Sequence, residues 1–183
     1  MKKVTLLGDS IRQIGYGKKV PELLGEDYEV FQPEENCRFV KYTLRMLFDY
    51  REQIKGSDVI HWNNGHWDIV TGLFEDGSPF TSEEEYVENM LRVAKELKKL
   101  GKRVIFATIT PVHDEYVYNK NSVIRRYNEI IVPKLQEIGV EINDLYSLVN
   151  QDVYKYICED QIHLSPEGID LCARQVVKAI KEK

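Results

Sequence analysis

Short apolar or alternating runs are separated along this chain by longer segments in which apolar positions recur every three or four residues. The short runs predict strands, and they lie at residues 4–7, 28–31, 59–62, 104–107 and 140–143. The longer periodic segments predict helices at residues 41–55, 81–101 and 123–138 and from residue 166 to the C-terminus, with a loop and a short helix over residues 11–24.

Cap residues and prolines indicate where two of the predicted helices begin and where a third is disturbed. The sequence from Thr81 to Glu85 carries the hydroxyl cap and acidic first turn of a helix start. Ser165 before Pro166 has the same meaning for the last helix. Pro133 falls inside the helix expected over residues 123–138, so we expect a kink or a break there.

Strands that alternate with helices predict a five-stranded parallel sheet covered on both faces, which is a three-layer α/β/α fold. The continuous apolar run at residues 104–107 is typical of a strand buried on both faces. The chain has 183 residues and shows no internal repeat, low-complexity segment or linker. We therefore expect one domain over residues 1–183.

Composition excludes several functional classes. Hydrophobic residues make up 43% and charged residues 30% of the chain, which are values of a globular protein. The net charge is −5 and no basic cluster is long enough for nucleic-acid binding. No apolar run approaches membrane-spanning length, and the run behind Lys3 is too short for a secretory signal. The cysteines number three, without metal-type or redox-type spacing, so we expect reduced thiols and a cytoplasmic protein.

The candidate chemistry lies where the predicted strands end. The carboxyl ends of parallel strands meet at one edge of a sheet, where ligands bind in such folds. Ser10 follows the first strand, Asn63 the third and Pro111 the fourth, and Asp160 and His163 lie in the loop after the fifth. We therefore expect these residues to share one face.

Ser10, Asp160 and His163 together have the residue types of a catalytic triad. A serine needs a base within hydrogen-bonding reach and a third group that orients this base. The three-residue spacing allows Asp160 to hold Nδ1–H of His163 while Nε2 faces Ser10. The tripeptide Gly8-Asp9-Ser10 on its own is more typical of an ordinary strand-to-helix turn with Asp9 or Ser10 as a cap, so the prediction depends on the combination.

Acyl transfer also needs donors for the oxyanion of the tetrahedral intermediate. The candidates are the backbone N–H of Ser10 and the side-chain amide of Asn63, with Asn64 as the alternative. Asn63-Asn64-Gly65 is also a favourable turn sequence, and the residues alone do not decide between the two interpretations.

These blocks resemble the SGNH, or GDSL, hydrolase superfamily. Gly8-Asp9-Ser10-Ile11, an asparagine after the third strand and Asp160-Gln161-Ile162-His163 occur in the order and spacing of that family along nearly the whole chain. The resemblance implies a flavodoxin-like fold and a serine esterase or lipase, often a sugar deacetylase, without metal or cofactor. It implies catalytic roles for Ser10, Asp160 and His163 and places Asn63 or Asn64 in the oxyanion hole.

Two departures from the family pattern concern the oxyanion hole. The family's second block usually supplies a glycine N–H, but residues 33–43 contain no glycine; a backbone N–H near Phe39, Val40 or Lys41 can still serve, because the donor is not a side chain. The third block usually reads Gly-x-Asn-Asp, and here Trp67 stands in the place of the asparagine. We choose Asn63 because a subgroup of the superfamily has its asparagine two residues before the glycine.

The substrate predicted from this resemblance is a small acyl ester, above all an O-acetyl group on a carbohydrate. Asp9, Arg12 and Trp67 are the candidate substrate-binding residues; Arg12 could read an acidic group or pair with Asp9 or Glu35. The alternatives are a lipid acyl esterase or thioesterase, and a non-catalytic binding module on the same fold. A nucleotide binder is disfavoured because the first turn lacks a phosphate-binding glycine pattern.

The remaining titratable and aromatic residues have weaker interpretations. A metal site is disfavoured because the spacing of the nearby acids and histidines matches no zinc pattern. Those residues are His61, His66, Asp68, His113 and Asp114. Aromatic side chains near the same face, Trp62, Trp67, Tyr16 and Tyr116, could stack on a sugar ring or belong to the core.

Overall fold

The sheet at the centre of the molecule has five strands, all parallel, in the order β2-β1-β3-β4-β5. The computed structural model describes residues 1–182. The strands are β1 (Lys2–Leu7), β2 (Tyr28–Phe31), β3 (Ser57–Trp62), β4 (Gly101–Ala107) and β5 (Glu141–Asn143). Each of the five predicted strands is present, and the predicted three-layer α/β/α fold is confirmed.

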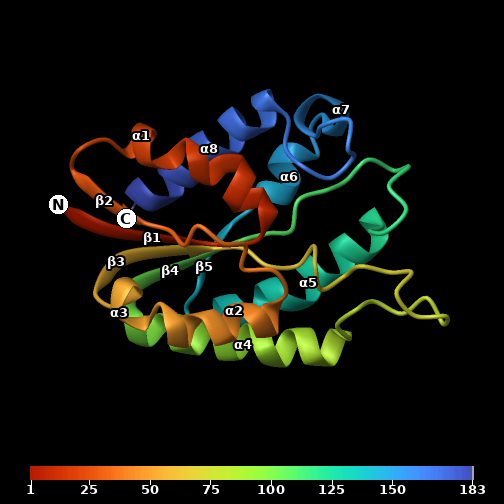
Figure 1. Ribbon diagram of the computed structural model, residues 1–183, viewed down its shortest axis with the longest axis horizontal. Coiled ribbons are helices and arrows are strands. Elements are labelled where there is room, and N and C mark those ends of the chain that lie inside the picture. The colour runs from red at the N-terminus through yellow and green to blue at the C-terminus, as the bar shows by residue number, and fades with distance from the viewer. Residues whose placement is uncertain (183) are drawn as a thin grey trace.

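Helices cover both faces of this sheet (Figure 1). One layer consists of α2 (Val40–Asp49), α3 (Arg51–Ile54), α4 (Glu83–Leu100) and α5 (Asn121–Glu137). The other layer consists of α1 (Val20–Leu24), α6 (Leu145–Val149), α7 (Val153–Tyr156) and α8 (Pro166–Lys181). A π-helical turn η1 (Ile11–Gly15) and a 3₁₀ turn η2 (Tyr16–Lys18) join β1 to α1.

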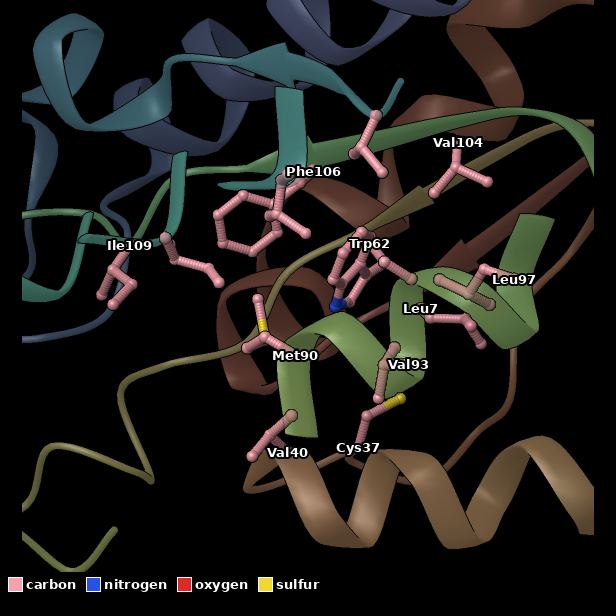
Figure 2. Packing of buried hydrophobic residues seen from close by; sticks show 14 of the residues in the cluster. Leu7, Cys37, Val40, Trp62, Met90, Val93, Leu97, Val104, Phe106 and Ile109 are labelled. Atoms are coloured by element: carbon pink, nitrogen blue, oxygen red, sulfur yellow. The ribbon is translucent and has the colours of Figure 1, made fainter. Parts of the chain in front are cut away.

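Alternate residues of the strands pack into two separate cores. In β1, Val4 and Leu6 belong to the core beneath α1 and α8, whereas Leu7 belongs to the core above α2 and α4. Figure 2 shows the second core, where Trp62 of β3 and Phe106 of β4 lie beside each other with ring centroids 4.9 Å apart. Burial on both faces explains why the strands are nearly continuous in apolar residues.

Two local predictions differ from the structure, and two short helices were not predicted. The helix predicted over residues 41–55 is interrupted at Tyr50, where φ is −101° and the hydroxyl donates a hydrogen bond to Glu35. A break at Pro133 does not occur, because α5 runs through this residue. The short helices α6 and α7 were not predicted, although Asp144 and Asp152 accept hydrogen bonds from the backbone N–H groups of Ser147 and Lys155 as helix caps.

The register of the strands determines which loop residues meet at the carboxyl edge. Leu7 pairs with Trp62, so the turns that begin at Gly8 and Asn63 leave the sheet side by side. Ala107 pairs with Asn143, which brings the segments after β4 and β5 to the same edge. Among the helices of residues 1–182, we find none with the length and apolar character needed to cross a membrane.

Candidate active site

Ser10 lies at the tip of β1, where the chain turns directly into the π-helical turn η1. The turn is held by Asp9, whose carbonyl accepts the N–H groups of Arg12 and Gln13 and whose Oδ1 accepts the N–H of Ile11 at 2.9 Å. A side chain at Gly8 would place its Cβ 2.0 Å from Oδ1 of Asn63. Only glycine allows this close approach of the β1 and β3 tips.

The structure brings Ser10, His163 and Asp160 together in one hydrogen-bonded series. Nε2 of His163 lies 2.9 Å from Oγ of Ser10, and Nδ1 lies 2.7 Å from Oδ2 of Asp160. Because a carboxylate only accepts, Nδ1 carries the proton and Nε2 is left to accept the Ser10 hydroxyl proton. The arrangement has the geometry of a nucleophile, a base and the group that orients the base.

Electrostatics keeps the orienting carboxylate ionised. Burial acts to raise the pKa of Asp160, but hydrogen bonds from the backbone and ring N–H of His163 and from the backbone N–H of Ile162 outweigh it. The net pKa of Asp160 therefore lies below its ordinary value. An ionised Asp160 holds the ring of His163 in a single tautomer.

The loop that carries Asp160 and His163 is held by backbone hydrogen bonds, one within the loop and one from the segment after β4. The N–H of Cys158 donates to the carbonyl of His163 at 2.7 Å, and the N–H of His113 donates to the carbonyl of Gln161 at 3.0 Å. Gln161 itself has φ +73°, a left-handed conformation that a residue other than glycine rarely adopts. Ser165 caps α8 as predicted, with its Oγ accepting the N–H of Gly168 at 3.1 Å.

Asn63 and Asn64 have different surroundings. Nδ2 of Asn63 donates to Oδ1 of Asp9 at 2.7 Å, and Oδ1 of Asn63 accepts the hydroxyl of Tyr16 at 2.8 Å. Nδ2 of Asn64 donates to the carbonyl of Arg38, and its Oδ1 accepts the indole N–H of Trp62. Asn63 thus lies beside the turn that carries Ser10, whereas Asn64 connects the loop after β3 to the segment before α2.

Arg12, a candidate substrate-binding residue, is buried among backbone carbonyls. Its guanidinium, in a residue only 2% exposed, donates to the carbonyls of Gly8, Pro33 and Glu35. The predicted pairing of Arg12 with Glu35 therefore involves the backbone carbonyl of Glu35 rather than its carboxylate. The structure assigns Arg12 the role of holding residues 33–35 against the end of β1.

Residues 33–43, the segment without glycine, contact the turn that carries Ser10 through their backbone. The N–H of Cys37 donates to the carbonyl of Gly8 at 3.0 Å. Arg38 has φ +49°, and its N–H is directed to Oδ1 of Asn36 at 2.7 Å. The N–H of Val40 donates to Asp68, but no hydrogen bond among residues 1–182 uses the N–H of Phe39.

Asp68, whose only role suggested by the sequence was that of a disfavoured metal ligand, is a buried carboxyl. It accepts the N–H of Val40 at 3.1 Å and the hydroxyl of Thr81 at 2.9 Å, and it thereby connects the start of α2 to the segment before α4. Burial, partly offset by these hydrogen bonds, raises its pKa to about 7. This structural role of Asp68 could not be inferred from sequence, because its partners Val40 and Thr81 come close to it only in the folded chain.

Asp68 makes a testable contribution to the pH dependence of stability. The folded chain holds a proton on Asp68 up to about pH 7, whereas the unfolded chain releases it near pH 3.8, so this group stabilises the fold less as the pH rises. Between pH 5 and pH 8 we expect the wild type to lose about 2 to 3 kcal/mol of unfolding free energy relative to Asp68→Asn. Urea denaturation of both proteins at pH 5 and pH 8 measures this difference in unfolding free energy.

The exposed turn residue Asp27 supplies the control for this experiment. Asp27→Asn removes a carboxylate outside the buried network and should reproduce the pH dependence of the wild type. Parallel curves for the wild type and Asp68→Asn would contradict the assignment.

Two of the three other histidines, His61 and His66, lie in separate hydrogen-bonded environments. Nε2 of His61 contacts Nδ2 of Asn143 at 3.1 Å, whereas Nε2 of His66 contacts Oγ1 of Thr110 at 3.0 Å. Burial lowers the pKa of each ring to about 3, so both are neutral near pH 7. Within residues 1–182, no three His, Cys, Asp or Glu side chains are grouped to hold a metal ion.

Trp67 is 42% exposed in the loop that follows β3. Asp9, by contrast, is fully buried beneath Ser10 and supports the turn rather than the substrate. Of the three candidate substrate-binding residues, only Trp67 has an accessible side chain.

Comparison with known proteins gives relatives of one kind. No family model matches the chain. It is 32% identical over 113 residues to GDSL esterase/lipase CPRD49 of Arabidopsis thaliana, a match that covers 54% of this chain and 44% of that protein. It is 26% identical over 162 residues to GDSL esterase/lipase WDL1 of Oryza sativa subsp. japonica, covering 80% and 62%. The chain thus spans less than two thirds of these relatives' length.

Solved structures share the fold over almost the full chain. A lipase/acylhydrolase from Enterococcus faecalis superimposes with a TM-score of 0.82 at 19% identity and covers 99% of this chain and 96% of that one. Axe2, an acetylxylan esterase from Geobacillus stearothermophilus, superimposes with a TM-score of 0.79 at 17% identity and covers 100% and 95%. The resemblance to the SGNH/GDSL hydrolases noted in the sequence is confirmed.

Proposed function

We propose that this chain, with the fold of the SGNH/GDSL hydrolases, is a serine ester hydrolase that removes a small acyl group, above all acetyl, from a carbohydrate hydroxyl. The observation that carries the proposal is the series from Oγ of Ser10 through His163 to Asp160, with distances of 2.9 and 2.7 Å. The names of the relatives, esterases and lipases, support the reaction class.

In the first half of the reaction, Oγ of Ser10 attacks the acyl carbonyl carbon and its proton moves to Nε2 of His163. The carbonyl π electrons move to oxygen, and the tetrahedral oxyanion forms. When the carbon–oxygen bond to the sugar breaks, Nε2–H protonates the leaving alkoxide. Asp160 stabilises the imidazolium throughout.

In the second half, water attacks the acyl-Ser10 ester and gives its proton to Nε2 of His163. The second tetrahedral intermediate collapses, Oγ of Ser10 takes the proton back from His163, and the free acid leaves. Ser10 is thereby regenerated for another cycle.

Three donors are available for the oxyanion in this proposal. They are the N–H of Ser10, the amide hydrogen of Asn63 that does not bond to Asp9, and the N–H of Phe39. Of the backbone N–H groups proposed to replace the absent glycine, that of Phe39 is chosen over that of Val40, which is directed to Asp68. The left-handed Arg38 just before Phe39 gives the chain the turn that a glycine would otherwise supply.

The choice of a carbohydrate acetyl ester rests on two observations. Structural neighbours include proteins described as acetylxylan esterases. Trp67 is exposed in the loop directly after Asn63 and Asn64, where its flat indole can pack on a sugar ring.

Hydrolysis of acetyl, butyryl and octanoyl p-nitrophenyl esters, together with acetate release from acetylated xylo-oligosaccharide, tests the proposal. We expect kcat/KM to fall at least about tenfold from acetyl to octanoyl, since each misplaced methylene costs binding in a small pocket. Activity that rises with chain length would favour a lipid acyl esterase or thioesterase. No hydrolysis and no labelling of Ser10 by a fluorophosphonate would favour a binding module.

A further inference from the structure

Behind the turn that carries Ser10 lies a buried series of polar side chains that joins Asp9 and Asn63 to residues outside the family motifs. It runs from Asn143 of β5 to His61 of β3, on to Tyr16 of η2, and then to Asn63 and Asp9. Tyr16 and His61 are both fully buried, and their rings meet edge to face with centroids 5.5 Å apart. No step of the mechanism above uses either of them.

The hydrogen bonds of this series can point in only one direction at the Asp9 end. Oδ1 of Asp9 already accepts the N–H of Ile11, so it acts as an acceptor toward Asn63 as well. The group of Asn63 that faces Asp9 must therefore be the NH₂, and its carbonyl oxygen faces Tyr16. That oxygen can only accept, so the single hydroxyl proton of Tyr16 is donated to Asn63 at 2.8 Å.

The remaining contacts follow from this assignment. With its proton committed to Asn63, the Tyr16 oxygen can only accept from Nδ1 of His61, a long contact of 3.5 Å. His61 is neutral because burial lowers its pKa to about 3, so Nε2 accepts from Nδ2 of Asn143 at 3.1 Å. Every donor in the series thus points toward Asp9.

Such a series fixes the amide of Asn63 at both ends. An amide held only by Asp9 could rotate about its side-chain torsions, whereas one held by Asp9 and Tyr16 has a single orientation. Because Nδ2 has two hydrogens and only one bonds to Asp9, the second has a defined direction. Preorganised donors of this kind stabilise a developing oxyanion without reorganising during the reaction.

We propose that Tyr16, supported by His61, is a positioning residue that holds the Asn63 amide in the orientation required of an oxyanion-hole donor. The inference rests on the proposed esterase function and deepens it. Tyr16 acts through Asn63 and touches no reacting atom.

A double-mutant cycle between Tyr16 and Asn63 tests the proposal. Asn63→Ala should lower kcat by about 10²- to 10³-fold, the usual effect of losing one oxyanion donor. Tyr16→Phe should lower kcat about tenfold with KM unchanged within about twofold, since Tyr16 positions a donor instead of supplying one. In the Asn63→Ala background, Tyr16→Phe should have no further effect on kcat.

Tyr127→Phe is the matched control for the loss of a buried hydroxyl. The hydroxyl of Tyr127 donates to a backbone carbonyl, that of Thr81, at 2.7 Å. This variant should lose stability similarly to Tyr16→Phe and keep the kcat of the wild type. If Tyr16→Phe does not fold, His61→Phe takes its place in the cycle and should give a smaller loss of kcat that also disappears with Asn63→Ala.

A second readout does not depend on activity. In the wild type, exchange of the Asn63 side-chain NH₂ protons with solvent, followed by ¹⁵N NMR, should be slow, and Tyr16→Phe should accelerate it at least about tenfold. Unchanged exchange, or equal kcat losses from Tyr16→Phe in both backgrounds, would overturn the role of Tyr16. Absence of Ser10-dependent hydrolysis with altered exchange would instead overturn the proposed function alone.

Discussion

Ser10→Ala should lower kcat for acetyl ester hydrolysis by at least about 10⁴-fold, because no other hydroxyl contacts Nε2 of His163 in the described part of the chain. The residual rate would come from the oxyanion donors and substrate binding. KM should change little, since the hydroxyl acts on the transition state. Steady-state kinetics with p-nitrophenyl acetate measures both quantities.

Ser147→Ala provides the control, since Ser147 is an exposed serine on α6. Ser147→Ala should retain wild-type kinetics, and both variants should keep the circular dichroism spectrum and an unfolding free energy within about 1 kcal/mol of the wild type. A Ser10→Ala protein with a well-preserved kcat would rule out the serine mechanism.

Asp160→Asn should lower kcat by about 10³- to 10⁴-fold while the loop stays in place. The asparagine oxygen can still accept the backbone N–H groups of Ile162 and His163 that now bond to Oδ1 of Asp160. Its NH₂, however, would face Nδ1 of His163 and favour the tautomer with the proton on Nε2. That ring cannot accept the proton of Ser10.

The neighbouring carboxylate offers a matched comparison, because Glu159 is exposed and does not bond to His163. Glu159→Gln changes the local charge by the same amount and should keep kcat within about twofold. Equal losses of kcat in the two variants would mean that Asp160 acts through its charge and that its hydrogen bond with Nδ1 of His163 does not contribute to kcat.

The strands and the large helices could be predicted from sequence because their signals are local. A run such as Val104 to Ala107, apolar at every position, has few alternatives to a doubly buried strand. The short helices α6 and α7 have too few turns to show a period, and only their aspartate caps could have indicated them. The break at Tyr50 coincides with a hydrogen bond from its hydroxyl to Glu35, which lies in the segment before α2.

The candidate triad could be predicted for a related reason. Strand ends of a parallel sheet share an edge, which places Ser10 and Asn63 together, whereas the Asp160–His163 loop was assigned to the same edge from its residue types and its place after the fifth strand. The role of Arg12 could not be predicted, because a charged side chain near a site is usually exposed, whereas here the guanidinium is buried and donates to three backbone carbonyls.

The sequence by itself indicated the five strands, the parallel sheet and the large helices, because periodicity acts over a few residues, and it offered Ser10, Asp160 and His163 as the candidate triad. Only the tertiary structure decided how the oxyanion side is built. Asn63 is oriented by Tyr16 and Asp9, and the N–H of Val40 donates to Asp68, so both contacts join segments far apart in the chain. Such contacts depend on register and packing across the sheet, which no local pattern encodes.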